Sequence, residues 1–529
     1  MNAHPAADVA VVGTGVVGLA VAHQLLRRGH AVTIIGPRPG AGARGQASAA
    51  AGAMLSPFSE VDAAQPESRV AMDVEQRLRA LARYPAWLEE LATATGIPVP
   101  LTAGTWVVAT EAERDSVAAI TRAAHDAGHT AEITAGTDID GLRPEVPPAI
   151  GLWLPGEPSL DITRLITTLS TAVARHRRVR WHAVDAVEVT TGTTPTRIRC
   201  TDGSTVECAR TVLAAGTGIP SLLGARAAEL GVPPVLAGRG VSLLLRAPVA
   251  VPHAVRTPNL AFACGTHLVP RHDGDLYLGA TNRLTIAPAD NPAATLDEIA
   301  VLIDDGTRRL EQRLRAAPLH RVQVGHRPYT LDHLPLVGPA RDSNLLVATA
   351  TYRCGVLLAP LLADLIADAI DDPAALDLHP YRTTRPITVP PLAELVDTEA
   401  ARGLAQHLLG PTIPVDAAAH RQLTALLAHA LPALVTRVGD PVGETLARLF
   451  AQAPVLEAVP ALLPLVERLE SPCRHRNPPS IPRPRSCTPR PPSGTAPAAP
   501  SDSTIGSTLS ATTRSTASLS PPPSNRTPA

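Results

Sequence analysis

Three glycines near the start of the chain have the spacing that could hold the pyrophosphate of a dinucleotide. Gly13, Gly15 and Gly18 form a G-x-G-x-x-G pattern. In such a pattern the first glycine permits a tight turn, the second lets a pyrophosphate approach the backbone, and the third lets a helix pack closely on a strand. The apolar run 9–12 precedes the pattern and a helical periodicity over 19–28 follows it. The sequence therefore predicts a dinucleotide-binding strand, loop and helix, with free helix N–H groups facing the phosphates.

The next strand, predicted over 31–35, departs from the usual dinucleotide pattern. Such a strand should end in an Asp or Glu that binds ribose hydroxyl groups, but Ile35 is followed by Gly36, Pro37 and Arg38. A basic residue at this place can bind a 2′-phosphate instead. An NADP-dependent reductase is therefore an alternative interpretation.

Arginine side chains are the groups of this sequence that could bind a carboxylate, and Arg327 and Arg353 are two of them. A guanidinium group presents two parallel donors and keeps its charge, which suits a carboxylate. Arg327 could instead form a buried ion pair with Asp332, and Arg353 could be a solvated loop residue.

The composition excludes several other chemistries. All 47 basic residues are arginines, so a Schiff-base lysine, a kinase lysine and a Walker-type phosphate lysine are ruled out. The six cysteines show no C-x-x-C pattern and predict no metal site. The formal net charge of −1 gives no reason to expect a nucleic-acid partner.

We expect no targeting or membrane segment. No basic region precedes the first apolar run, which argues against a signal peptide. The apolar stretch 356–370 is interrupted by Asp364 and Asp368, a helical spacing that favours an amphipathic helix over a membrane span. The sequence therefore predicts a cytoplasmic protein with no membrane partner.

The elements that must position these residues change in character along the chain. Residues 1 to about 380 alternate β-rich runs with helical patterns, which indicates an α/β protein. Residues 392–470 predict short amphipathic helices broken by prolines. Residues 471–529 contain Pro, Ser, Thr and Arg with almost no large apolar side chain, so we expect this tail to be disordered.

A run of small residues follows the second predicted strand. From residue 47 the chain reads ASAAAGAMLSP, which would let the backbone approach an extended cofactor. Together with the glycine pattern, this run resembles the D-amino-acid oxidase family of FAD-dependent enzymes, and most of all the glycine oxidases of the thiamine-biosynthesis type. In that family the corresponding segment runs beneath the pyrophosphate and reaches the flavin ring. The run could otherwise be a low-complexity alanine loop.

Two further stretches resemble cofactor-binding parts of that family. Residues 179–189 look like the strand whose backbone, at Val184 here, would meet the adenine. Residues 209–219 look like the strand and glycine turn that precede a second cofactor contact, with close approach at Ala215 and Gly216.

Two more stretches resemble the substrate-binding parts. Residues 266–281 predict two strands about a tight turn and look like the family's substrate-domain hairpin, with His267 where relatives commonly have an aromatic residue. Residues 324–360 resemble the C-terminal active-site stretch of glycine oxidases, with Cys354 where relatives often have Asn. There the arginine at the position of Arg327 pairs with the substrate carboxylate.

The resemblance implies a set of site residues. The catalytic residues implied are Arg327, Tyr352 and Arg353, and the substrate contacts implied are Arg327, His267 and Tyr352. The FAD contacts implied are Gly13, Gly15, Val16, Val17, Gly18, Ser48, Ala51, Gly52, Met54, Val184, Ala215, Gly216, Gly355, Val356 and Leu357. No cysteine lies within 324–339, so the FAD should be bound non-covalently.

The resemblance also implies a fold and a reaction. We expect a doubly wound, Rossmann-like FAD domain built from about 1–90, 150–225 and 325–380, interleaved with a mixed-sheet substrate domain from about 90–150 and 225–325. The reaction implied is oxidative deamination of glycine, a small D-amino acid or an N-methyl amino acid, by hydride transfer to flavin N5. Electrons would pass to oxygen or another acceptor.

Two questions stay open at this point. The FAD fold could be a non-catalytic scaffold that acts through the helical region 392–470. The chain could also form a homo-oligomer.

Overall fold

Two fully buried strands lie side by side within a six-stranded sheet. β1 (Val9–Val12) and β2 (Val32–Ile35) are buried along their whole length, as expected of parallel strands that are covered on both faces. The strand order is β20-β21-β13-β1-β2-β9, and every neighbouring pair is parallel except β20 with β21. The other strands of this sheet are β9 (Val179–His182), β13 (Arg210–Leu213), β20 (Leu336–Pro339) and β21 (Leu345–Thr349).

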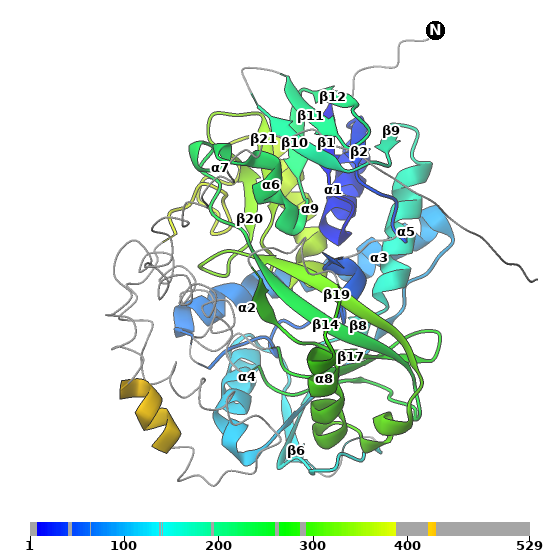
Figure 1. Cartoon of the computed structure of the whole chain (residues 1–529), viewed down its shortest axis with the longest axis vertical. Coiled ribbons are helices and arrows are strands. Elements are labelled where there is room, and N and C mark those ends of the chain that lie inside the picture. The colour runs from blue at the N-terminus through cyan, green and yellow to red at the C-terminus, as the bar shows by residue number, and fades with distance from the viewer. Residues whose placement is uncertain are drawn as a thin grey trace, which may run out of the picture. The chain divides into compact units, whose positions relative to one another are not determined.

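Helices cover one face of this sheet. Because alternate residues of a strand point to opposite faces, Val9 and Val11 of β1 pack in a core with apolar side chains of these helices. The helices are α1 (Val16–Arg27), α2 (Glu67–Leu81), α3 (Tyr84–Thr95), α5 (Ile162–Arg175) and α9 (Gly355–Asp371). Figure 1 shows α1, α5 and α9 beside the strands β1 and β2.

A small antiparallel sheet covers the other face. Ala10 and Val12 of β1 pack against it in a second core. Its strands are β10 (Ala186–Thr190), β11 (Thr196–Cys200) and β12 (Thr205–Cys208), and the short helices α6 (Ile219–Leu223) and α7 (Arg226–Glu229) lie beside it.

A second, mixed sheet is built from the intervening segments. Its strand order is β3-β19-β14-β17-β16-β15-β5-β7-β6, with β18 paired to β14. Two long antiparallel strands, β14 (Leu236–Arg246) and β19 (Leu319–Tyr329), bring Gly240 opposite Gly325. The remaining strands are β3 (Gly45–Gln46), β5 (Thr105–Ala109), β6 (Glu132–Ala135), β7 (Ile150–Leu154), β15 (Ala254–Arg256), β16 (His267–Pro270), β17 (Asp275–Gly279) and β18 (Arg283–Thr285).

Two helices pack on the mixed sheet. They are α4 (Arg114–Asp126) and α8 (Leu296–Arg309). Thr295 and Glu298 form a capping box at the start of α8, and Glu298 also makes a fully buried ion pair with Arg239 of β14. A strand pair, β4 (Leu101–Thr102) with β8 (Ser159–Leu160), and the 3₁₀ turns η1 (Ser48–Ala50), η2 (Glu111–Glu113), η3 (Gly216–Gly218) and η5 (Gln312–Ala316) complete the described elements.

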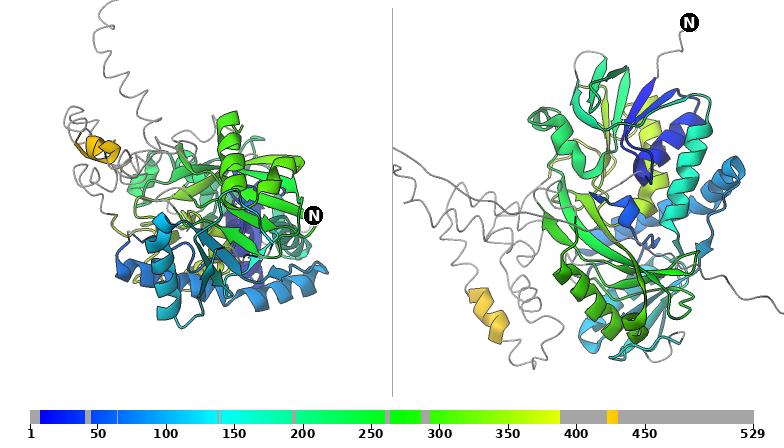
Figure 2. Two further views of the ribbon diagram at one scale, coloured as in Figure 1. Left: turned by 90° about the horizontal axis from the view of Figure 1, so that it is seen from below. Right: turned by 45° about the vertical axis from the view of Figure 1, so that its right-hand side comes forward.

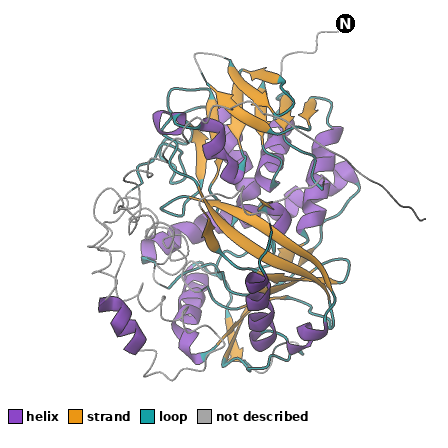
Figure 3. Cartoon of the chain, viewed as in Figure 1, coloured by secondary structure: helices purple, strands orange, loops and turns teal. Residues whose placement is uncertain are grey.

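The predicted α/β class with an interleaved mixed sheet is confirmed. Figure 3 shows the strands in two groups, and Figure 2 shows the same two groups from two other sides. The first sheet takes strands from three separate parts of the sequence, 9–35, 179–213 and 336–349, and the mixed sheet takes those between. The exact domain boundaries stay a prediction.

The structure describes residues 8–40, 45–63, 65–136, 139, 141–191, 195–259, 264–285, 293–387 and 422–429. Contacts divide the chain into two units, Met1–Glu470 and Ser471–Ala529. The predicted tail lies outside the described residues, and so does the predicted helical region 392–470, except for 422–429, which are helical. None of the helices within the described ranges has the length and hydropathy needed to cross a membrane.

Candidate active site

A single large cavity brings together nearly all the residues predicted for the site. Its volume is about 820 Å³, within the usual range of cofactor and ligand pockets. Segments far apart in the sequence line it, among them the β1–α1 loop, residues from the segment 46–54, residues 185–187, residues 214–218, and residues between Gly325 and Leu357 in β19 and at the start of α9. Side chains of the mixed sheet and of the loop at Glu60 also line it. Of the predicted residues, only Gly18 and Val184 are outside its lining.

The glycine loop has the close packing that a dinucleotide site needs. Gly13 has φ +115°, and a Cβ there would lie 2.4 Å from the carbonyl oxygen of Ala214. A Cβ on Gly18 would lie 2.1 Å from the carbonyl oxygen of Gly13. Gly18 therefore lets α1 pack on the loop instead of lining the cavity. Gly15, Val16 and Val17 present the N-terminus of α1 to the cavity, where N–H groups and the helix dipole favour phosphate.

Side chains of the mixed sheet and its hairpin donate hydrogen bonds to the run of small residues. The carbonyl oxygen of Ala50 accepts hydrogen bonds from Tyr277 Oη (3.0 Å) and Ser242 Oγ (3.2 Å), and that of Ala51 accepts one from Arg271 (2.8 Å). At the other end of the run, the Val16 N–H donates to Ser48 Oγ (3.0 Å). Because these contacts hold the segment and its residues 47–54 line the cavity, the alternative of an unconnected alanine loop is wrong.

The end of the cavity near β2 has no acidic side chain at the expected ribose position. Gly36 has φ +149°, and a Cβ there would lie 2.9 Å from Thr14 Cγ2. The indole of Trp181 donates to the carbonyl oxygen of Gly36 (3.0 Å), and Arg38 stacks on that indole at 4.7 Å, outside the cavity lining. Val184 packs with the second core, and the three residues after it line the cavity: Asp185, Ala186 and Val187.

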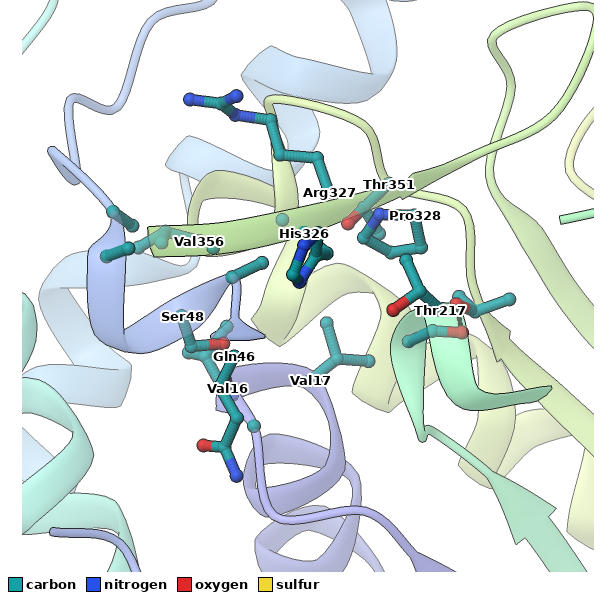
Figure 4. A pocket seen from close by; sticks show the side chains of 18 of the residues that line it. Val16, Val17, Gln46, Ser48, Thr217, His326, Arg327, Pro328, Thr351 and Val356 are labelled. Atoms are coloured by element: carbon teal, nitrogen blue, oxygen red, sulfur yellow. Dashed lines mark hydrogen bonds between the residues drawn. The ribbon is translucent and has the colours of Figure 1, made fainter. Parts of the chain in front are cut away.

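Arg327 lies at the opposite end of the cavity with its guanidinium group held in place. Its Nη1 donates to the carbonyl oxygen of Thr281 and to Asn282 Oδ1, both at 3.0 Å, and Asn282 Nδ2 donates to the hydroxyl of Tyr352 (2.9 Å). Figure 4 shows Arg327 and His326 projecting from opposite sides of β19. The alternative pairing with Asp332 is wrong, because Asp332 forms its ion pair with Arg385 (2.7 Å).

Glycines make room for these side chains too. A Cβ on Gly240 of β14 would lie 2.3 Å from Arg327 Nη1, and a Cβ on Gly52 would lie 2.8 Å from His267 Nε2. Gly240 was not predicted as a site residue. A glycine inside a strand often marks the close approach of another group, but no strand was predicted at this position from the sequence.

His267 is a neutral hydrogen-bond acceptor at this end. Burial lowers the pKa of His267 to about 3. Its Nδ1 lies 2.8 Å from the carbonyl oxygen of Gly265, and because a carbonyl oxygen can only accept, Nδ1 carries the hydrogen and Nε2 keeps a lone pair. The imidazole stacks on Tyr277 with ring centroids 5.4 Å apart, and burial raises the pKa of Tyr277.

An ion-pair network that the sequence did not reveal surrounds Glu60. Glu60 accepts hydrogen bonds from Arg256 (2.6 Å) and Asn259 (3.1 Å). Arg353 Nε forms an ion pair with Glu60 Oε2 at 2.8 Å. Burial alone would raise the pKa of Glu60, but the Arg353 and Arg256 guanidinium groups hold it well below its usual range. The side chain of Arg353 is 12% exposed, so the alternative of a solvated loop arginine is wrong.

The loop before α9 carries the last group of lining residues. Tyr352 has φ +48°, and its N–H donates to the carbonyl oxygen of Pro328 (2.8 Å), which ties the loop to the end of β19. Burial raises the pKa of the Cys354 thiol. Gly355 begins α9, so the positive end of this helix dipole faces the cavity.

The geometry fits an FAD. The cradle of glycines and small residues, the N-terminus of α1 and the N-terminus of α9 all border one cavity. The residues predicted to contact the FAD pyrophosphate or flavin ring line this cavity, and these roles stay a prediction: Gly13, Gly15, Val16 and Ser48 would hold the pyrophosphate, and Ala51, Gly52, Met54, Gly355, Val356 and Leu357 would lie beside the flavin ring.

Comparisons with known proteins agree with this geometry. The family described as FAD dependent oxidoreductase matches residues 8–369. A bifunctional protein ThiO/ThiG of Trichormus variabilis is 30% identical over 435 residues, which cover 77% of this chain and 59% of that protein. A glycine oxidase of Geobacillus kaustophilus is 30% identical over 395 residues, which cover 72% of this chain and 97% of that enzyme. The chain thus spans only 59% of the length of the bifunctional relative.

A solved structure extends the comparison to three dimensions. The crystal structure of glycine oxidase from Geobacillus kaustophilus superposes with a TM-score of 0.63 and 27% identity, and the match covers 72% of this chain and 99% of that one. The fold of this chain therefore has a solved counterpart of similar sequence.

Proposed function

Because the chain belongs to the family of FAD-dependent oxidoreductases, we propose that it oxidises the C–N bond of glycine, a small D-amino acid or an N-methyl amino acid. One observation supports this proposal above all: the held guanidinium group of Arg327 shares a cavity with the glycine loop. The α-carboxylate that all these substrates have in common would bind there. The proposal also follows from the similarity to glycine oxidases.

Arg327 would orient the substrate. Two parallel N–H donors can bind both oxygens of one carboxylate, and Thr281 and Asn282 restrict the guanidinium group to one geometry. Tyr352, through its hydroxyl contact with Asn282, would close the same side of the cavity. The chemistry that FAD would supply when bound is the acceptance of a hydride equivalent from the substrate carbon, with transfer of the electrons to oxygen or another acceptor. The contribution of the protein is then mainly positioning.

The site residues also favour the neutral amine that the reaction requires. Arg327, Arg256 and Arg353 all line the substrate end, and nearby positive charges lower the pKa of an ammonium group. The lone pair of His267 Nε2 would accept an N–H of the substrate. Since burial lowers the pKa of His267 to about 3, it would orient the amine and would not compete for its proton near pH 7.

Two earlier alternatives lose their support. The matching family is FAD-dependent, and Arg38, which suggested NADP, stacks on Trp181 outside the cavity. A non-catalytic scaffold is not supported either, because the matched family and the similar glycine oxidases are enzymes. Non-covalent binding of FAD stays part of the proposal.

Anaerobic mixing with candidate substrates tests the proposed reaction. Glycine, sarcosine and D-alanine are added to the FAD-loaded protein, and bleaching of the flavin absorbance is followed. We expect bleaching by at least one of them. In Arg327→Met the substrate concentration needed for half-maximal bleaching should rise roughly a hundredfold, because a buried charge pair is lost. The matched control, Arg38→Met, removes an arginine outside the cavity and should leave bleaching unchanged. Equal bleaching by wild type and Arg327→Met would overturn the role of Arg327.

A further inference from the structure

Two arginines beside Arg327 differ in how their donors are used. The guanidinium group of Arg256 is surrounded by acceptors: Nε donates to the Thr257 carbonyl oxygen (3.2 Å), Nη1 to Glu60 (2.6 Å), and Nη2 to Asn259 Oδ1 (2.5 Å). Arg256 is 1% exposed. This arginine is therefore a structural brace with little left to offer a ligand.

Arg353 has donors to spare. Its Nε faces Glu60 at 2.8 Å, and its guanidinium group lies 4.7 Å from the ring centre of Tyr352. Its Nη1 is buried, and among the described residues no acceptor lies within hydrogen-bonding reach of it. Leaving a buried charged donor unsatisfied is costly. Because Arg353 lines the cavity, a bound molecule could supply the acceptor.

Glu60 cannot supply it. Its two carboxylate oxygens already contact Arg256, Asn259 and the Nε edge of Arg353. A second buried carboxylate, Glu157, lies behind this network outside the cavity lining, and it accepts hydrogen bonds from the Ser59 hydroxyl and backbone N–H groups. Both carboxylates are therefore saturated by the protein itself.

The lining at this end of the cavity carries more positive than negative charge. Among the described residues, the charged side chains there are one carboxylate, Glu60, and three guanidinium groups, Arg256, Arg327 and Arg353. An α-carboxylate on Arg327 would balance one of them. A ligand with a single negative charge therefore leaves one positive charge at this end unbalanced.

A chain of contacts connects the two arginines. Asn282 accepts from Arg327 and donates to the hydroxyl of Tyr352, and the Tyr352 ring stacks with Arg353. Both guanidinium groups thus border the same part of the cavity, joined through Asn282 and Tyr352.

We propose that the substrate carries a second carboxylate, which binds the free Nη donors of Arg353 while Arg327 binds the α-carboxylate. The substrate class is then an amino acid with two carboxylates. This inference rests on the proposed function, since it assumes that Arg327 binds the α-carboxylate. Glu60 and Arg256 are positioning residues that hold the Nε edge of Arg353 and leave its Nη edge to the cavity.

Binding of unreactive carboxylates to the FAD-loaded protein tests this proposal without turnover. Matched pairs are titrated by their effect on the flavin spectrum: acetate with malonate, propionate with succinate, and butyrate with glutarate. In at least one pair we expect the dicarboxylate to bind roughly tenfold more tightly or better, the effect of a charge-assisted hydrogen bond. Equal affinity within every pair would overturn the proposal.

Variants show which side chain causes the preference for dicarboxylates. Arg353→Met should bring the affinity ratio of the best pair close to one, whereas the control Arg114→Met, which removes an arginine whose side chain is 63% exposed, should leave it unchanged. Glu60→Gln should raise the ratio, because it removes a buried negative charge that repels a second carboxylate while an amide oxygen can still face the Nε edge of Arg353. If Arg353→Met keeps the full ratio, the second carboxylate does not bind there and the proposal fails. Should Glu60→Gln not fold, the Arg353→Met result still decides.

Turnover separates this proposal from the proposed function. If glycine or sarcosine bleaches the flavin while dicarboxylates show no preference, the second-carboxylate inference is overturned and the proposed function stands. If dicarboxylates bind preferentially through Arg353 but neither D-aspartate, D-glutamate nor glycine bleaches the flavin, the ligand class is supported and the proposed reaction is wrong.

Discussion

The two ends of the cavity are built in different ways. The end at the glycine loop consists of backbone and small side chains from neighbouring positions in the sequence, Gly13 to Val17, packed on Ala214. The end at Arg327 consists of long polar side chains whose positions lie far apart, from Glu60 to Arg353. The first end is therefore a local motif, while the second exists only when several distant strands and loops meet.

The comparison predicts different consequences for mutations at the two ends. Changes at the first end should remove the cofactor altogether. Changes at the second end should leave the cofactor bound and alter the affinity for carboxylates.

The largest effect is expected for Gly13→Ala. Alanine at φ +115° with its Cβ 2.4 Å from a carbonyl oxygen should cost about 3 kcal/mol or more, roughly a hundredfold or more in FAD affinity. The measurement is FAD released per protein after purification. Gly203→Ala is the matched control, because Gly203 also has positive φ (+82°) but nothing lies within 4 Å of its added Cβ. Full FAD content in Gly13→Ala would show that the loop does not hold the cofactor.

Gly240→Ala should have the next largest effect, at the other end. Its Cβ would overlap Arg327 Nη1, so the guanidinium group must move, and the affinity for carboxylate substrates should fall roughly 30-fold or more. FAD content should be unchanged. Gly156→Ala is the control, since its added Cβ would have only an ordinary contact at 3.4 Å. Wild-type KM for the substrate in Gly240→Ala would contradict the assigned place of Arg327.

A smaller effect is expected for Asn282→Ala. This change removes one hydrogen bond to the Arg327 guanidinium group and one to the Tyr352 hydroxyl, and it should raise KM roughly tenfold. Steady-state kinetics of Asn282→Ala, Tyr352→Phe and the double variant measure the coupling. If the two single effects simply add, Asn282 does not link Tyr352 to Arg327.

The smallest effect is expected from lowering the pH, which should reduce the free energy of unfolding through two buried histidines. His23 of α1 and His267 have pKa values lowered, mainly by burial, from 6.5 to about 4 and about 3. Between these values and 6.5 the folded protein binds fewer protons than the unfolded chain, so the stabilisation present above pH 6.5 is lost as the pH falls toward 4. The slope should be at most about 1.4 kcal/mol per pH unit for each histidine.

Urea unfolding at a series of pH values measures this slope. His23→Asn should reduce it in that range, because one of the buried histidines that must gain a proton on unfolding is gone. An identical slope in wild type and His23→Asn would contradict the assigned pKa. The exposed control is His272→Asn, which should leave the slope unchanged.

Much of the cofactor end was predictable because each requirement is local. Gly13, Gly15 and Gly18 stand between an apolar strand and a helical pattern, and that order alone implies a phosphate-binding turn. The covering of the second face of the sheet by β10, β11 and β12 was not predicted. Short alternating strands do not reveal which layer they will join.

The amino-acid order also drew attention to Arg327, since it lies in a stretch that resembles glycine oxidases. It did not reveal Asn282 or Gly240 as its neighbours, nor the network that Glu60, Arg256 and Asn259 form beside Arg353. These residues come from a loop and from strands of the mixed sheet that are separated by up to two hundred or so positions. Their contacts depend on strand register and loop path, and nothing at any one of these positions records them.

Local spacing was thus enough to predict the α/β class and the glycine turn of this chain, and the resemblance of its motifs to a known family added FAD. Only the tertiary structure decided which arginine is held by acceptors of the protein and which keeps free donors. The proposed kind of substrate depends on that difference. Backbone turns and helix starts follow from interactions between near neighbours, whereas charge balance in a cavity follows from groups that meet only when the chain is packed.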